Sequence, residues 1–207
     1  MTDTSDVIDD YLVWELCKQQ DIQRMITEGS ANGEELKEEI IEKVRQGYQE
    51  KSYDHSEKID KIWELGSNPE YRCKTFESCS WSKETVKVED LGTTLPRFGD
   101  LPPEVITGSL SDVIEFVKEA DPDEYQSVKY IMRLKEVPEV LNEFLPVVIS
   151  PGSTIRELER MDNAHGEKDW DIKETWGAVH DANHRTIAKI LANDSEKIEC
   201  YVGRPKQ

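Results

Sequence analysis

The sequence predicts an α+β fold, in which a small mixed β-sheet with packed helices follows a helical N-terminal region. Two observations lead to this prediction. Apolar residues recur at helical spacing in three stretches before residue 67, and each stretch is bounded by residues that start or stop helices. Short apolar or alternating runs, typical of strands, occur from residue 85 onward. We therefore divide the chain into a helical N-terminal region, residues 1–84, and an α/β domain, residues 85–207.

The N-terminal region is expected to contain three helices packed on a shared apolar core. They are predicted at residues 8–28, 32–48 and 54–66. Asp54 and Glu57 have the spacing of a capping box, in which the side chain at the helix start and the one three residues on bond each other's backbone. Residues 67–84 are polar and rich in turn formers, so we predict a loop there.

In the second half of the chain, signals for strands alternate with signals for helices. Strands are predicted at residues 85–89, 146–149 and 198–202. One helix is predicted from Ser109, where Asp112 completes a capping box, and another from Asp121, which is followed by Pro122 in the first turn. Residues 90–108 are rich in glycine and proline, and a long irregular segment of this kind often lines a binding site.

The stretch from Trp176 to Leu191 concentrates the residue types that bind ligands, and we interpret it as a strand, a tight turn and a helix. Asp181 and Asn183 supply turn chemistry, because their side chains bond the nearby backbone. Apolar residues then recur at helical spacing. Three polar residues fall in the first helical turn: His184, Arg185 and Thr186. Backbone N–H groups point outward from a helix start, so this turn is suited to hold a phosphate.

A second interpretation makes residues 171–192 one continuous helix. His180 and His184 would then lie one turn apart on the same face, in the pattern His-Asp-x-x-His. This pattern is similar to the zinc-binding His-Glu-x-x-His of metalloproteases, with Asp181 in place of the general base. A third metal ligand would come from the end of the chain: Glu196 or Glu199.

The composition of the chain bears on which partners it binds and on where it is found. The chain has 44 acidic and 26 basic residues and a net charge of −18, which disfavours non-specific binding to nucleic acids. Its acidic first residues differ from a signal peptide, and no apolar run approaches the roughly 18 residues that span a membrane. The four cysteines have no spacing typical of a zinc or redox site. We expect a cytoplasmic protein with reduced thiols.

Three pieces of the second half, taken together, resemble the ParB/sulfiredoxin-like superfamily. They are Pro-Val-Val-Ile at residues 146–149, Val-His-Asp-Ala-Asn-His-Arg at residues 179–185, and Ile-Glu-Cys-Tyr-Val at residues 198–202. In that superfamily, a strand ends in Asp-Gly-x-His-Arg or a relative of it, and the motif opens a helix whose start binds nucleotide phosphates. Its members include CTP-binding partition proteins, ATP-dependent sulfiredoxin and small-molecule kinases.

Residue by residue, the resemblance carries over to Asp181, His184 and Arg185. Ala182 stands where glycine is usual, which limits how closely a phosphate approaches the backbone. Asn183 takes the place of the reactive cysteine of sulfiredoxin, so repair of sulfinic acids is not expected.

The resemblance implies a nucleotide- or phosphate-binding protein, and a small-molecule phosphotransferase is its most concrete form. Asp181 would act as the base or the Mg²⁺ partner. His184 would bind phosphate or move a proton. Glu104 is a candidate second carboxylate by analogy with the kinases. The expected phosphate cradle comprises Asn183, His184, Arg185 and Thr186. The ligand is expected to be ATP, ADP or CTP with Mg²⁺.

Two other functions stay open at this point. One is a zinc hydrolase that uses His180 and His184, and the other is a non-catalytic interaction protein whose helical half binds a protein partner. The site residues also have structural interpretations, Asp181 as a helix cap and Arg185 as part of a surface salt bridge. The long segment at residues 150–175 carries His165 and Trp170, which are expected to reach a ligand.

Overall fold

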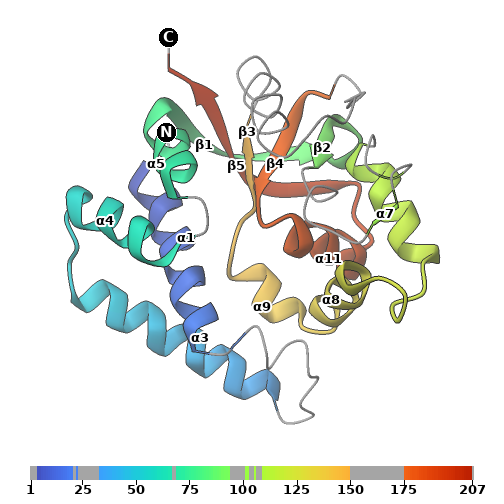
Figure 1. Ribbon diagram of the computed structural model, residues 1–207, viewed down its shortest axis with the longest axis horizontal. Helices are drawn as coiled ribbons and strands as arrows, with labels where there is room; N and C mark the ends of the chain where they lie inside the picture. The colour runs from blue at the N-terminus through green and yellow to red at the C-terminus, as the bar shows by residue number, and fades with distance from the viewer. Residues whose placement is uncertain are drawn as a thin grey trace.

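The computed structural model describes residues 4–20, 22, 33–66, 69–93, 101–102, 105, 109–149 and 175–206. They form a mixed α+β fold in which helices pack around a five-stranded sheet, which confirms the predicted fold class (Figure 1). The strands are β1 (Cys79–Lys87), β2 (Leu91–Thr93), β3 (Val147–Ile149), β4 (Gly177–Asp181) and β5 (Lys197–Pro205).

The sheet has the strand order β1-β5-β3-β4-β2 and mixes both pairing directions. β1 is antiparallel to β5 along nine residues, and β5 is parallel to β3. β3 is antiparallel to β4, which is parallel to β2. The short strands β3 and β4 therefore lie near the middle of the sheet, where β3 is buried on both faces.

The N-terminal helices gather beside β1, at the left in Figure 1. They are α1 (Thr4–Gln19), α3 (Gly33–Glu50), α4 (His55–Leu65) and α5 (Pro69–Ser78). α1 contacts each of the other three and also β1. The predicted capping box at the start of α4 is confirmed, because the Asp54 side chain accepts from the Glu57 amide and the Glu57 side chain accepts from the Asp54 amide.

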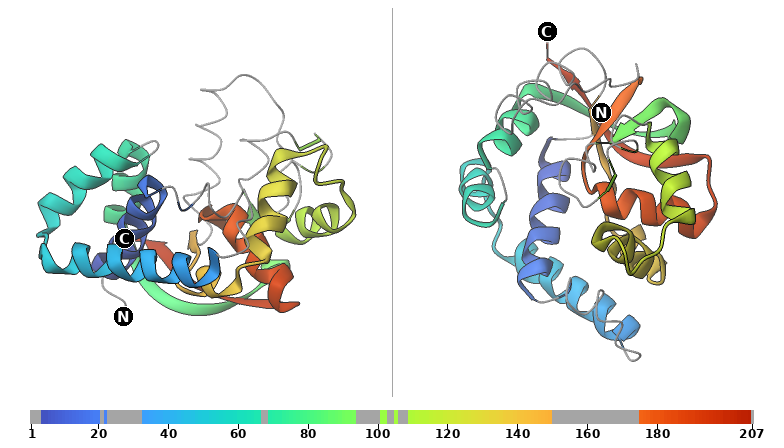
Figure 2. Two further views of the ribbon diagram at one scale, coloured as in Figure 1. Left: turned by 90° about the horizontal axis from the view of Figure 1, so that it is seen from below. Right: turned by 45° about the vertical axis from the view of Figure 1, so that its right-hand side comes forward.

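The remaining helices pack at the other side of the sheet, where α11 contacts α7, α8, α9 and β4 (Figures 1 and 2). They are α7 (Leu110–Glu119), α8 (Gln126–Lys135), α9 (Pro138–Asn142) and α11 (Asn183–Asn193), with a short 3₁₀ helix, η1 (Val88–Asp90), after β1. The capping box of Ser109 and Asp112 at the start of α7 is also confirmed.

Several predictions about the path of the chain were wrong. The helix predicted at residues 8–28 is α1, which runs from Thr4 to Gln19, and β2 lies in the segment predicted to be irregular. The stretch expected to be a loop contains α5 and the first residues of β1, so the first strand starts at Cys79 rather than at residue 85. The helix expected from Asp121 starts at Gln126 instead. Asp121 accepts a hydrogen bond from the amide of Asp123, which holds these residues in a turn before the helix.

Within the described ranges, none of the helices combines the length and the apolar character needed to cross a bilayer.

Candidate functional site

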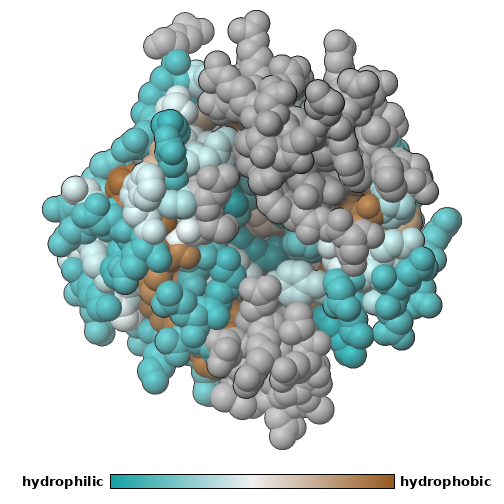
Figure 3. Space-filling view, in the orientation of Figure 1, coloured by the Kyte–Doolittle hydropathy of each residue, from teal (hydrophilic) through white to brown (hydrophobic). Residues whose placement is uncertain are grey.

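The chain leaves the sheet at Asp181 and enters α11 through a single residue, Ala182. This residue is left-handed, with φ 69° and ψ 31°, and α11 begins at the next residue. The strand–turn–helix interpretation is therefore confirmed, and the interpretation as one continuous helix was wrong. In the orientation of Figure 1 the start of α11 lies near the middle of the molecule, where Figure 3 shows a recessed hydrophilic surface between grey atoms.

β4 is held in place from both sides, which fixes the point at which the chain turns. It pairs with β2 through Gly177, Ala178 and Val179, and with β3 on its other edge. A Cβ atom at Gly177 would lie 2.9 Å from the carbonyl oxygen of Ile149. Glycine is needed there because β3 and β4 approach so closely.

The carboxylate of Asp181 lies between two arginines. Its Oδ1 is 3.0 Å from Nη2 of Arg72 on α5, and its Oδ2 is 3.5 Å from Nη2 of Arg185 on α11. Burial by itself would raise the pKa of Asp181, but the two guanidinium groups outweigh it and hold the pKa below its usual value. Asp181 therefore stays ionised, and both of its oxygens are occupied.

This arrangement changes the role of Asp181 that we expected from the sequence. A general base needs a carboxylate oxygen that can reach the substrate proton and a pKa near the working pH. Asp181 has neither, because both oxygens face arginines and its pKa is lowered. The geometry makes Asp181 a residue that positions Arg72 and Arg185.

Arg185 points into the protein rather than towards solvent. Its guanidinium lies 4.0 Å from the ring centroid of Trp14 and 5.4 Å from that of Phe144, and the residue is 7% exposed. Rings in this position stabilise a cation through their negative faces. The cavity beside Arg185 and Asp181 is only about 10 Å³, the size of one water molecule. Arg185 therefore does not form a surface salt bridge, and its guanidinium is not open to a phosphate, so both roles predicted from the sequence were wrong.

His180 lies on β4, four residues before the helical residue with which it was expected to pair. The prediction of a His-Asp-x-x-His helix was wrong for this reason. The His180 ring is buried, and its Nδ1 shares a hydrogen bond of 3.1 Å with the hydroxyl of Tyr71 on α5. Burial, together with Arg72, lowers the pKa of His180 to about 3, so the ring is neutral near pH 7.

The polar residues of the first turn of α11 have distinct surroundings. Oδ1 of Asn183 accepts a hydrogen bond of 2.6 Å from the hydroxyl of Thr93, which joins the helix start to β2. His184 is half-buried and meets the ring of Tyr130 edge-on, with 5.2 Å between ring centroids. The predicted phosphate contact of Thr186 is corrected, because its hydroxyl and its amide both donate to the carbonyl of Ala182.

Around Asp181, several buried donors and acceptors lack a partner. In the part of the chain that the structure describes, these are Nε of Arg72, Nη1 of Arg185 and Nε2 of His180, with the hydroxyl of Tyr11 beside Arg72. Two arginines face one aspartate, and two further acids lie close by: Glu15 acts electrostatically on both arginines, and Asp10 acts on Arg185. The arginine N–H donors without a partner favour an anion that comes within reach.

Sequence reasoning missed Arg72 and Tyr71, which α5 brings to the end of β4. Arg72 also donates to the carbonyl oxygen of His180, at 3.3 Å. Both residues lie more than 100 positions before Asp181 in a segment predicted to be a loop, so no local signal identifies them. The predicted residues Glu104, His165 and Trp170 lie outside the described residues.

The described residues contain no group of three histidine, cysteine, aspartate or glutamate side chains arranged to hold a metal ion. Glu196 and Glu199, the expected third zinc ligands, lie beyond the far end of α11 from His184, in the turn before β5 and in β5.

Comparison of the chain with protein-family models, with curated proteins and with solved structures finds no match. The resemblance to the ParB/sulfiredoxin-like superfamily therefore stays a prediction.

Proposed function

We propose that this protein binds the phosphate of a nucleotide, or of another small ligand, at the start of α11, in a fold of the ParB/sulfiredoxin-like class. The observation that carries the proposal is the turn at Ala182. This turn places the start of α11, a helix of 11 residues, directly after the end of β4. The N-cap residue is Ala182, whose side chain cannot accept a hydrogen bond from the first amides of the helix. The positive end of the helix dipole favours an anion at this place.

Two buried arginines next to the turn support the same proposal. Arg72 and Arg185 flank Asp181, and within the described residues each keeps one buried N–H donor without a partner. Arg185 is enclosed by Trp14 and Phe144, so it acts through its electric field rather than by a direct fork to the ligand. The direct contacts would come from the amides of the first turn and from His184.

The proposed activity is binding, and phosphotransfer with Asp181 as base is not part of it. The carboxylate of Asp181 is held by two guanidinium groups, so it cannot take a proton from a hydroxyl nucleophile without losing both ion pairs. Candidate ligands remain ATP, ADP and CTP, with Mg²⁺ carried by the phosphates rather than by Asp181.

Asn183→Asp tests this proposal with little change of shape. The new carboxylate keeps an oxygen that can accept from Thr93, and an acid in the first turn stabilises a helix by about 0.3–1 kcal/mol. It also places a negative charge where the phosphate would bind. We expect ATP, ADP, CTP or GTP with Mg²⁺ to raise the melting temperature of the wild type, and the shift to disappear in Asn183→Asp.

Asn193→Asp is the matched control, because it makes the same chemical change at the exposed other end of α11. Its melting temperature should rise with the nucleotide as in the wild type. The proposal is rejected if none of the four nucleotides shifts the wild type, or if Asn183→Asp keeps the full shift. Arg185→Ala is a poorer test, because removing a buried side chain beside Trp14 destabilises the fold with or without a ligand.

A further inference from the structure

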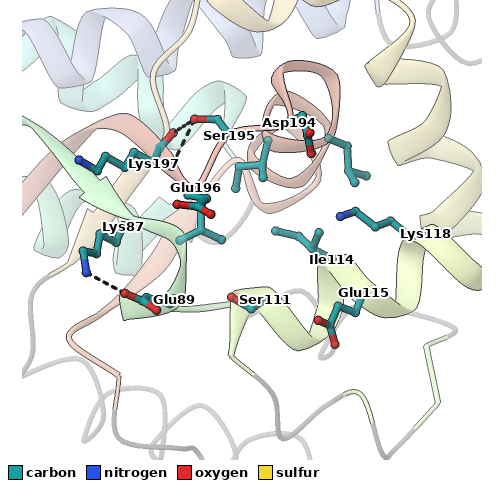
Figure 4. Close-up of a pocket in the computed structure, with 13 residues that line it drawn as sticks. Lys87, Glu89, Ser111, Ile114, Glu115, Lys118, Asp194, Ser195, Glu196 and Lys197 are labelled. Carbon is teal, nitrogen blue, oxygen red and sulfur yellow. Dashed lines mark hydrogen bonds and ion pairs between the residues drawn. The ribbon is translucent and has the colours of Figure 1, made fainter.

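A second hollow lies at the opposite end of α11 from Ala182. It is a cavity of about 430 Å³ between α7, η1 and the turn that joins α11 to β5, and Figure 4 shows the residues that line it. This volume is within the range of sites that bind small molecules. Its apolar surface comes from four residues: Val88, Ile114, Ile190 and Leu191.

Two opposite charges face each other across this cavity. Figure 4 shows the ammonium group of Lys118 and the carboxylate of Glu196 directed inward from opposite walls, whereas Glu115 and Lys87 are directed outward. Lys87 is already paired with Glu89, at 2.8 Å. Within the described residues, no hydrogen bond or ion pair engages the side chain of Lys118 or of Glu196, and the Glu196 carboxylate interacts with Lys87 only through its electric field.

Glu196 directs a carboxylate into the cavity from the side on which α11 meets β5. α11 ends there, and the carbonyl oxygens of a last helical turn favour a cation. Asp194 also lines the cavity and follows the helix directly, in a left-handed conformation. An amine is therefore favoured on this side of the cavity, and a carboxylate is favoured on the side of Lys118.

We propose that this cavity binds a small zwitterion whose amine and carboxylate stand at opposite ends of an apolar body, such as a dipeptide of aliphatic residues. The amine would pair with Glu196, the carboxylate with Lys118, and the body would cover Ile114 and Ile190. A nucleotide is disfavoured, because the lining has four carboxylates against three lysines and offers little attraction to several phosphates.

Titration of the protein with leucyl-leucine, followed by NMR or calorimetry, tests the site. We expect saturable binding, and binding at least about tenfold weaker for N-acetyl-leucyl-leucine and for leucyl-leucine amide, since each lacks one charge. The proposal is overturned if leucyl-leucine does not bind, or if the capped peptides bind equally well.

Three single variants show where the peptide binds. Glu196→Gln and Lys118→Gln should each weaken binding by about tenfold, because each removes one charge-assisted contact. Glu115→Gln is the matched control: it lines the same cavity but is directed outward, so its affinity should equal that of the wild type. Equal affinities for Glu196→Gln and Glu115→Gln would place the peptide elsewhere and refute the assignment. The result is independent of the nucleotide experiment, which concerns the other end of α11.

Discussion

Ala182 adopts a backbone conformation that costs energy for any residue with a Cβ atom. Its φ of 69° is left-handed, and this conformation costs an L-residue roughly 1 kcal/mol or more. Ala182→Gly removes that strain, and part of the gain is offset by the greater freedom of glycine in the unfolded chain. We expect the free energy of unfolding to rise by about 0.5–1 kcal/mol, measured by urea denaturation.

Ala178→Gly, in β4, is the comparison for this prediction. The residue lies in a regular strand, where glycine lowers stability by roughly 0.5–1 kcal/mol. The two variants should therefore change stability in opposite directions. If Ala182→Gly is destabilised as much as Ala178→Gly, the left-handed turn does not exist in solution.

His180 predicts a pH dependence of stability. Its pKa is about 3 in the folded protein and near 6.5 in the unfolded chain, so between these values only the unfolded chain binds the proton. The contribution of His180 to the free energy of unfolding is therefore fully present above about pH 6.5. It falls as the pH drops below this value, by up to about 1.4 kcal/mol per pH unit. His180→Asn, which does not titrate, should show a smaller loss between pH 7 and pH 5 in urea denaturation. Equal losses would contradict the assignment.

The turn at the site was predictable from the sequence, whereas the environment of its charged residues was not. Asp181 and Asn183 are turn formers, and the spacing of the apolar residues after them indicated a helix. From the sequence, Arg185 is expected at the surface, because arginine is seldom buried. Its burial depends on Trp14 on α1 and on Phe144 in the bend after α9, and neither has a local link to it in the sequence.

At the scale of the elements, the pairing of β1, β5 and β3 leaves no room for a side chain at Gly203. An added Cβ atom would lie 2.7 Å from the Trp81 ring and 2.9 Å from a methyl group of Ile149. Overpacking of this kind costs about 1–3 kcal/mol, so Gly203→Ala should lower the midpoint of urea unfolding.

Gly47→Ala gives the matched comparison in α3. A Cβ atom there meets nothing within 4 Å, and alanine is favoured over glycine in a helix by about 1 kcal/mol. This variant should raise the midpoint of urea unfolding. A rise for both variants would show that the three strands are not packed as closely as described.

The elements with clear local signals were predicted well, and those that depend on distant partners were not. The capping boxes at Asp54 and Ser109 mark helix starts by local hydrogen bonds, which the sequence displays directly. β1 is polar along much of its length because exposed side chains alternate with buried or half-buried ones along the strand. Its pairing with a strand more than 100 residues away has no signature within β1 itself.

At the scale of the molecule, α1 connects the N-terminal helices to the sheet. Asp10 accepts a hydrogen bond of 2.8 Å from the hydroxyl of Tyr201 on β5 and one of 3.2 Å from Arg45 on α3. Trp14 packs against Phe144, with ring centroids 5.1 Å apart, and against Arg185. The helices and the sheet therefore share one buried core, and we expect them to unfold together.

Trp14→Ala tests this coupling, because it empties the space between α1, the Phe144 ring and the Arg185 guanidinium. Truncating a buried tryptophan costs about 3–5 kcal/mol, and the loss should appear in the same single transition by far-UV circular dichroism and by tryptophan fluorescence. Trp63→Ala is the control: Trp63 lies on α4 and is 53% exposed, against 5% for Trp14. Its removal should change stability by less than about 0.5 kcal/mol. Two separate transitions in the wild type would mean that the helices and the sheet fold independently, and Trp14→Ala would then affect one of them alone.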